Sequence, residues 1–314
     1  MKKIDFTDLD KTGRAFGTVT AEEYHRRFHT DAAKLENCIS KSSLVEFAAS
    51  PFLYRYNIEN GVRKTSPGFR FGSLLDTLVL TPDEFALRYK VDTPRVAMTK
   101  AGTPYSNGMQ DREQAAEWAE LAAQGVTVIS PEEMAAAEAA RDKVNATLAK
   151  QGLILGDTFD SQVGLAFKMA MPVLGKNGEE ETCTITVTGM IDILPRDPAL
   201  PIIDLKTTSK PVHIRYEIDK QIRAYTYGWQ AAFYADMVRA VMQQERFFRF
   251  LFVDSAAPHC RAWVDMQAAE LDSYRKKYRP KLAEFAQCCH TNTWPGEELE
   301  PRNYQITPWE EFDI

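Results

Sequence analysis

The chain has little cysteine and no long apolar segment. These two features argue against a disulfide-stabilised secreted protein and against a membrane protein. Only 5 of its 314 residues are cysteine, and they are scattered along the sequence. This argues against a disulfide framework and for a reducing compartment. No apolar run approaches the ~18–20 residues that span a bilayer, and the two lysines near the N-terminus precede no apolar block of a signal peptide. We therefore expect a soluble, cytoplasmic protein with no membrane partner.

Several chemical motifs are also missing. The sequence contains no Walker-type phosphate loop and no Ser–His or Cys–His nucleophile motif, so ATP-driven unwinding is not expected of this chain. Cys288 and Cys289 are adjacent and lack the C-x₂-C spacing of an iron–sulfur site. No iron–sulfur cluster is expected.

Charge is unevenly distributed along the chain. The 38 basic and 44 acidic residues give a formal charge of −6, but much of the excess lies in 291–314, an acidic tail. The remainder is close to neutral, so the acidic total does not exclude a nucleic-acid partner. We expect an N-terminal arm over 1–39, one nuclease-sized domain over 40–290, and the tail.

Hydrophobic periodicity predicts a mixed α/β fold around one central sheet. A Ser43–Glu46 capping box is expected to open a helix that stops at Ser50–Pro51, and a second box opens a helix at Ser130. The other expected helices cover about 69–80, 218–243 and 267–289, and the expected strands cover 162–173, 183–194, 200–206, 246–253 and 260–265.

Charged side chains interrupt two apolar strands. Asp204 and Lys206 share one face of the strand 200–206, and Ile203 and Leu205 share the opposite face. Asp192 arrives from the neighbouring strand. Burying such charges is costly unless each finds a partner or a metal.

Two interpretations of these charges follow. Converging aspartates offer hard oxygen ligands for Mg²⁺ or Mn²⁺, and the lysine can orient a water or stabilise charge on a phosphate. Alternatively, Asp204 and Lys206 form a weak ion pair on an exposed hairpin, worth ~0–1 kcal/mol. The pattern alone favours neither.

Four short motifs occur in order along the chain. They are the segments SKSSLVEFAASPFLY (40–54) and FGSLLDTLVLTPDEF (71–85), the combination of G-x-I-D (Gly189–Asp192) with D-x-K (Asp204–Lys206), and Q-x-x-x-Y (Gln230–Tyr234). Together they resemble the PD-(D/E)XK nuclease superfamily, and within it the RecE-type exonucleases (exodeoxyribonuclease VIII).

The resemblance implies a restriction-endonuclease-like core, a central mixed β-sheet flanked by helices. It makes Asp192, Asp204 and Lys206 the catalytic residues. Asp192 and Asp204 would bind metal with the Leu205 carbonyl. Asp76, at a position where relatives usually carry a histidine ligand, would be a further metal ligand. A second departure is Gln162, where many relatives have an acidic residue.

The same resemblance assigns supporting roles. Gln230 and Tyr234 would contact DNA or hold the site together, although flanking the apolar stripe of their helix is the simpler interpretation. Asp76 has the alternative of a helix-surface position. Ser43 would bind a terminal phosphate through free amides, but helix capping is the commoner role.

The implied function is a Mg²⁺-dependent exodeoxyribonuclease. It would degrade linear double-stranded DNA 5′→3′ and expose single strands for phage-type recombination, as a ring-forming homo-oligomer working with a single-strand annealing protein. The alternatives are an endonuclease or nickase on the same core, and a catalytically inactive DNA-binding or assembly protein.

Overall fold

The computed structural model describes residues 1–28, 30, 37–62, 70–99, 102–103 and 111–297. The part of the predicted acidic tail beyond 297 lies outside these residues. Within them, no helix is both long and apolar enough to cross a membrane.

The described residues form one seven-stranded sheet and a separate two-stranded sheet. The large sheet has the order β1-β5-β6-β7-β8-β9, with β2 pairing β6. The β7–β8 and β2–β6 pairs are parallel and the others are antiparallel, so the sheet is mixed. Its strands are β1 (Arg14–Thr18), β2 (Cys38–Ser40), β5 (Phe159–Leu174), β6 (Glu180–Pro195), β7 (Ile202–Thr208), β8 (Phe248–Asp254) and β9 (Arg261–Met266).

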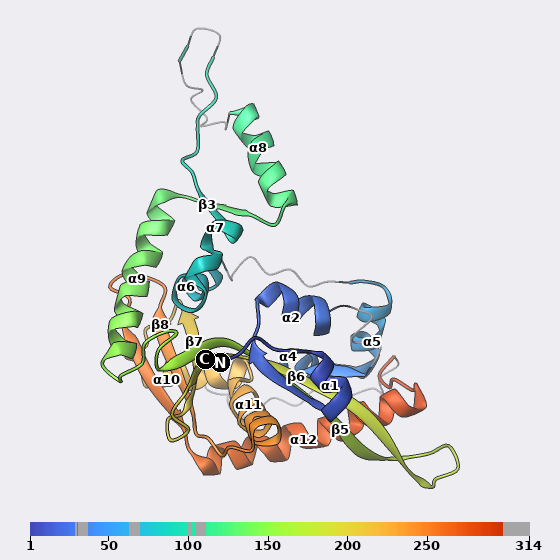
Figure 1. Ribbon diagram of the computed structural model, residues 1–314. Coiled ribbons are helices and arrows are strands. Elements are labelled where there is room, and N and C mark those ends of the chain that lie inside the picture. Colours follow the sequence, from blue (N-terminus) through green and yellow to red (C-terminus); the bar gives the residue numbers. More distant parts are fainter. Residues whose placement is uncertain (29, 31–36, 63–69, 100–101, 104–110, 298–314) are drawn as a thin grey trace, which may run out of the picture.

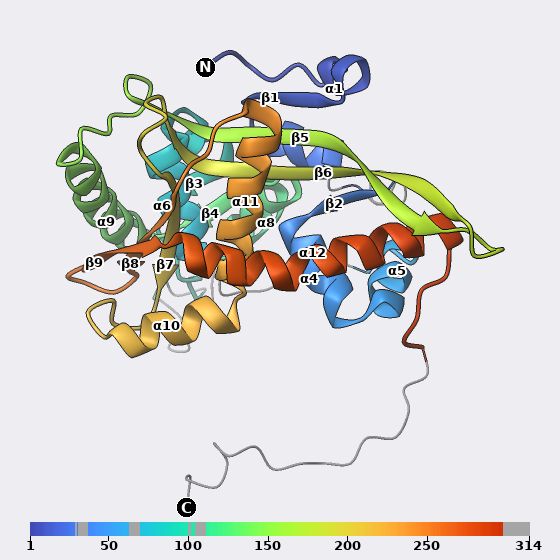
Figure 2. The same ribbon diagram turned by 90° about the horizontal axis from the view of Figure 1, so that it is seen from below.

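Helices cover both faces of this sheet (Figures 1 and 2). The larger core lies against α4 (Lys41–Ala49), α5 (Pro51–Glu59), α10 (Arg215–Ala224), α11 (Tyr227–Met242) and α12 (Ala268–Thr291). The second core lies against α6 (Arg70–Leu80) and α9 (Pro131–Ala149). The remaining elements are α1 (Thr7–Thr12), α2 (Ala21–Phe28), η2 (Pro82–Glu84), α7 (Phe85–Arg88), β3 (Tyr89–Val91), α8 (Arg112–Ala123) and β4 (Thr127–Ile129). The α8 helix projects from the body beyond the β3–β4 pair (Figure 1).

Alternation along β7 divides its side chains between the two cores. Ile202 lies in the larger core, whereas Ile203 and Leu205 lie in the second. This is the two-sided burial expected of a central strand. Asp204 and Lys206 therefore lie on the α11 side of the sheet, the face that Ile202 also occupies.

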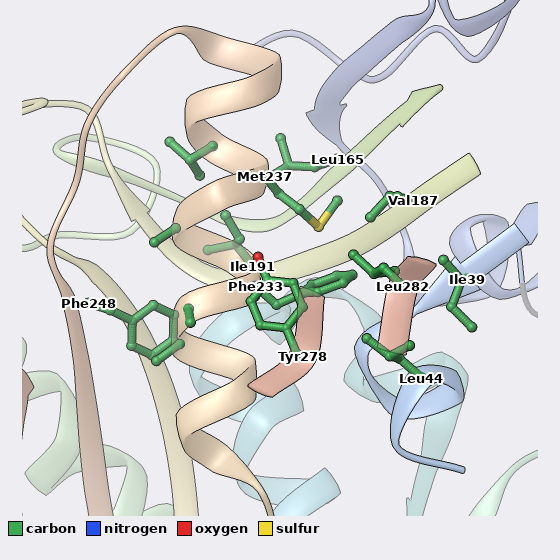
Figure 3. Packing of buried hydrophobic residues seen from close by; sticks show 14 of the residues in the cluster. Ile39, Leu44, Leu165, Val187, Ile191, Phe233, Met237, Phe248, Tyr278 and Leu282 are labelled. Carbon is green, nitrogen blue, oxygen red and sulfur yellow. The ribbon is translucent and has the colours of Figure 1, made fainter. Parts of the chain in front are cut away.

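The larger core fixes α11 against β5 and β6. Figure 3 shows Phe233 and Met237 of α11 directed toward Leu165, Val187 and Ile191 of these strands. Gly189 is what lets the helix come so close, since a Cβ added there would lie 2.8 Å from the Met237 sulfur and 3.0 Å from the Tyr234 ring. The glycine of the G-x-I-D motif is thus a packing requirement.

Two local predictions are wrong. The expected helix 218–243 is two helices, α10 and α11, because Thr226 takes the left-handed conformation (φ +52°) and ends the helical run. Both halves bury residues at helical spacing, so periodicity does not reveal the break. The Ser43–Glu46 capping box is also absent: α4 begins at Lys41, and the Ser40 side chain accepts from the Ser43 N–H.

Other predictions are confirmed. The capping box at Ser130 forms with Glu133 and opens α9. The helix predicted over 69–80 is α6, and the five predicted strands correspond to β5–β9. The division into an arm, a domain and a tail stays a prediction; within 1–39, β1 lies at one edge of the sheet and pairs with β5.

Candidate active site

Strands β6 and β7 separate beside the predicted site. The two strands pair at Ile193 opposite Ile203. Next to this pair, the Asp192 side chain, instead of the β6 backbone, bonds the β7 backbone. Its Oδ2 accepts a hydrogen bond of 3.0 Å from the Leu205 N–H. The side chain of one strand thereby satisfies the backbone of the next, and it brings Asp192 next to the D-x-K motif.

Asp204 is the most buried charged group of the site, at 2% exposure. Its Oδ1 accepts a hydrogen bond from Gln230 Nε2 at 2.5 Å, and its Oδ2 lies 2.5 Å from Lys206 Nζ. The Oδ2 contact is an ion pair, and no other side chain among the described residues bonds this buried oxygen. A carboxylate buried to this degree is costly without such a counter-charge.

Lys206 lies between the carboxylates and an aromatic ring. Its ammonium is 5.1 Å from the centroid of the Tyr227 ring, a cation–π contact. Burial opposes the charged form, but the carboxylates of Asp204 and Asp192 outweigh burial and raise the pKa of Lys206 above its usual value. Lys206 is therefore an ammonium ion at neutral pH.

Asp76 reaches the site from the opposite face of the sheet. It lies one turn after Gly72, where an added Cβ would be 2.7 Å from Thr207 Oγ1, so α6 packs directly against β7. Burial raises the pKa of Asp76 to about 7, Lys206 opposes the rise and Asp204 adds to it. Asp76 is thus electrostatically linked to the D-x-K pair.

The site carries more negative than positive charge. Burial raises the pKa of Asp192 well above its usual value, and the neighbouring Asp204 and Asp76 add to the rise while Lys206 opposes it. Three carboxylates therefore interact with the Lys206 ammonium, and of these Asp204 contacts it directly. Hard oxygen donors with uncompensated charge suit a divalent cation such as Mg²⁺.

The donor set fits such a cation in chemistry, but it is not assembled around one. Among the described residues, no three His, Cys, Asp or Glu side chains are grouped as a metal site. Lys206 and Gln230 occupy the Asp204 carboxylate, and the Leu205 N–H occupies one oxygen of Asp192. The role of the Leu205 carbonyl stays a prediction.

The Q-x-x-x-Y pair supports the site from α11. Gln230 holds Asp204 directly, as described above. Tyr234 is further from the charges: its ring packs under Gly189, and burial raises the pKa of its hydroxyl, against a hydrogen bond from the Met190 backbone. A contact of either residue with DNA stays a prediction.

Ser43 belongs to the N-terminal turn of α4 rather than to the group of charges. It is buried, its N–H donates to Ser40 Oγ, and its own hydroxyl oxygen accepts from the same Ser40 hydroxyl at 3.1 Å. These contacts are those of a helix start. Its predicted role in phosphate binding is not tested by them.

Two residues that the sequence analysis did not name also border the site. Lys41 Nζ donates to the Tyr225 carbonyl at 3.2 Å, and burial lowers its pKa to about 8, with Lys206 contributing and Asp204 opposing. Tyr227 lies under the Lys206 ammonium. Tyr227 precedes Gln230 by three residues and shares its helix face, a spacing that marks it. Lys41 carries no such signal, because only the packing of α4 brings it here.

Comparison with known proteins agrees with the fold. Residues 178–301 match the model of a family described as a PDDEXK-like domain of unknown function, a segment that runs from β6 to beyond α12. The chain thus has the predicted fold class, a mixed α/β fold with a PDDEXK-like domain and a central mixed sheet flanked by helices.

Two further comparisons add little to this. No curated protein matches the chain. Among solved structures, it is similar to a protein from Eubacterium rectale described as a "putative exonuclease", with a TM-score of 0.48 and 15% identity over 95% of this chain and 94% of that one. At this level of likeness, the description of that protein carries no argument about this one.

Proposed function

We propose that this protein is a metal-dependent deoxyribonuclease that hydrolyses phosphodiester bonds at the β6–β7 site. The observation that carries the proposal is the buried Asp204 carboxylate beside Asp192 and Lys206, with Asp76 electrostatically linked to them. Strands β6 and β7 lie in the segment that matches a PDDEXK-like domain. A structural ion pair needs no second and third carboxylate. A cation site does.

The residues present divide the chemistry between them. Asp192, Asp204, Asp76 and the Leu205 carbonyl would hold Mg²⁺ or Mn²⁺, which when bound acts as a Lewis acid and activates water. Lys206, already protonated, would stabilise negative charge on the scissile phosphate and orient the attacking water, instead of accepting its proton. Gln230 would keep the Asp204 carboxylate oriented.

The finer assignment rests on the ordered motifs that resemble RecE-type exonucleases. We propose 5′→3′ degradation of linear double-stranded DNA, which exposes single strands for phage-type recombination. The same resemblance supports a homo-oligomeric ring and a single-strand annealing protein as partner. An endonuclease or nickase would use the same residues on closed DNA.

A catalytically inactive DNA-binding or assembly protein is the second candidate. It is favoured by the departures at Asp76 and Gln162 and by the occupied carboxylates in the described residues. In that case the Lys206–Asp204 ion pair would persist in the presence of Mg²⁺. Mg²⁺ would then neither stabilise the protein nor lead to cleavage of DNA.

The test is digestion of linear and closed-circular duplex DNA with Mg²⁺ or with EDTA, by wild type and by Lys206→Ala. Lys206→Arg, which keeps the charge, serves as a second variant in case the alanine form does not fold, and Lys176→Ala, in the exposed β5–β6 turn, is the matched control. We expect metal-dependent loss of linear DNA alone with wild type and control, and none with either Lys206 variant.

Each other outcome points elsewhere. Cleavage of the circle would replace the exonuclease by the endonuclease. Folded wild-type protein that cleaves neither substrate with Mg²⁺ or Mn²⁺ would make the inactive DNA-binding protein the better description.

A further inference from the structure

The α10 helix is exposed on one side and carries aromatic and basic residues there. Ile218 and Ile222 bury one side in the larger core, whereas Tyr216, Lys220 and Arg223 recur at helical spacing on the other. Tyr216 is 64% exposed. Figure 2 shows α10 at the periphery of the described fold, beyond the end of α11.

The charge of this helix is opposite to that of the chain. Lys220 and Arg223, with Lys210 just before the helix, are exposed and form no ion pair with the described residues. Arg215 and Asp219 pair with each other at 3.7 Å, and Glu217 is half-buried. A locally cationic surface on a protein of net charge −6 favours an anionic partner.

Tyr225 connects this surface to the site. Its side chain is 59% exposed at the corner where α10 ends, and its ring centroid lies 5.6 Å from that of Tyr227. Tyr227 in turn contacts the Lys206 ammonium. On the other side, Lys41 binds the Tyr225 carbonyl and holds the corner. The exposed surface is therefore connected to the catalytic lysine through the rings of Tyr225 and Tyr227.

We propose that Lys210, Tyr216, Lys220, Arg223 and Tyr225, the α10 surface, bind a single strand of DNA beside the active site. The inference rests on the proposed nuclease function and adds that the strand to be cleaved is unpaired where it reaches the site. Exposed tyrosines can stack on the face of an unpaired base, which base stacking covers in a duplex. Lysine and arginine side chains without an ion pair bind the phosphates regardless of sequence. The strand would run from the α10 surface past Tyr225 toward Lys206.

Binding is measured without cleavage, as the anisotropy of a labelled oligothymidylate titrated with protein in EDTA. Tyr225→Ala is expected to weaken binding on the order of tenfold, the effect of losing one base–aromatic stack. Tyr225→Phe keeps the ring and is expected to keep the affinity. Lys220→Gln/Arg223→Gln is expected to reduce the slope of log K against log salt by about 1.4, since each phosphate contact to a single strand contributes roughly 0.7.

Matched controls come from elsewhere on the chain. Lys276→Gln/Lys277→Gln removes two exposed cations of α12, and Tyr56→Ala removes an exposed tyrosine of α5. Both controls are expected to bind as wild type does. The same titrations with a duplex of equal length should show no loss for Tyr225→Ala, and melting curves verify that each variant is folded.

The outcomes separate this inference from the proposed function. Three results would refute binding of a single strand by the α10 surface while leaving cleavage at the Lys206 site intact. They are no measurable single-strand binding by wild type, equal losses in the α12 control, and an equal loss of duplex binding in Tyr225→Ala. Conversely, selective loss of single-strand affinity in a protein that cleaves nothing would retain the surface and refute the nuclease.

Discussion

Lys206 Nζ and Asp204 Oδ2 lie 2.5 Å apart, two residues along one face of β7, with the aspartate 2% and the lysine 18% exposed. The Lys206 ammonium and a metal cation would therefore compete for the same oxygen of Asp204. A buried ion pair of this kind is strongly destabilised when only one partner is removed.

Replacing Lys206 by methionine tests this competition without any assay of activity. The variant leaves Asp204 buried without its counter-charge, so the free energy of unfolding in EDTA should fall by about 3–5 kcal/mol. Because Asp204 Oδ2 then lacks its ammonium partner, Mg²⁺ should raise the melting temperature of Lys206→Met more than that of wild type. An equal response of both proteins to Mg²⁺ would argue against a cation site at Asp204.

Gln230→Ala removes the hydrogen bond that holds the Asp204 carboxylate. We expect kcat to fall about 10- to 100-fold, as when the residue supporting a metal ligand is lost, with little change in KM. Gln287→Ala is the control, because the Gln287 side chain also joins two elements by hydrogen bonds, to the exposed Leu174 backbone, but lies far along α12 from the site. Steady-state kinetics on linear duplex DNA provide the comparison, and similar losses in both variants would reveal a general packing effect.

Asp76→Asn should stabilise the metal-free protein. Burial raises the pKa of Asp76 from 3.8 to about 7, so the ionised carboxylate destabilises the fold increasingly as pH rises from the unfolded to the folded value. In EDTA the variant should therefore melt higher than wild type near pH 8, and the difference should shrink toward zero below about pH 3, where the carboxyl is protonated in both the folded and the unfolded state.

The exposed Asp83, just beyond α6, supplies the control for this measurement, and Asp83→Asn should shift the melting temperature at neither pH. With Mg²⁺ the wild type should gain more stability than Asp76→Asn. A variant less stable than wild type in EDTA at high pH would show that the carboxylate is already compensated.

The contact of Gly72 with Thr207 sets how close α6, and with it Asp76, comes to β7. Gly72→Ala places a Cβ 2.7 Å from Thr207 Oγ1, so either α6 or the β-branched Thr207 side chain has to shift, and we expect kcat/KM to fall by about tenfold. Thr207→Ala removes the obstructing oxygen and should restore activity in the double variant. Cleavage rates of the four proteins form a double-mutant cycle, and strictly additive effects would contradict this geometry.

Much of the fold follows from local pattern. The alternation in β7 assigns Ile202 to one face and Ile203 and Leu205 to the other, and the two cores receive them accordingly. Apolar period and capping residues likewise locate α6, α9 and the strands β5–β9, because each depends on residues a few positions apart. The same local rules miss the break at Thr226, since its cause is a left-handed residue between two helices of matching periodicity.

The sequence by itself determined which groups are available for chemistry: Asp192, Asp204 and Lys206 on adjacent strands, and Gln230 on the following long helical segment. Only the tertiary structure decided how they meet, with Asp192 bound to the Leu205 N–H, Gln230 bound to Asp204, and Lys41 brought to the Tyr225 carbonyl. These contacts join residues from 13 to 184 positions apart. Their distances depend on how closely α4, α6 and α11 pack on the sheet, which is set by glycines and core side chains outside the motifs.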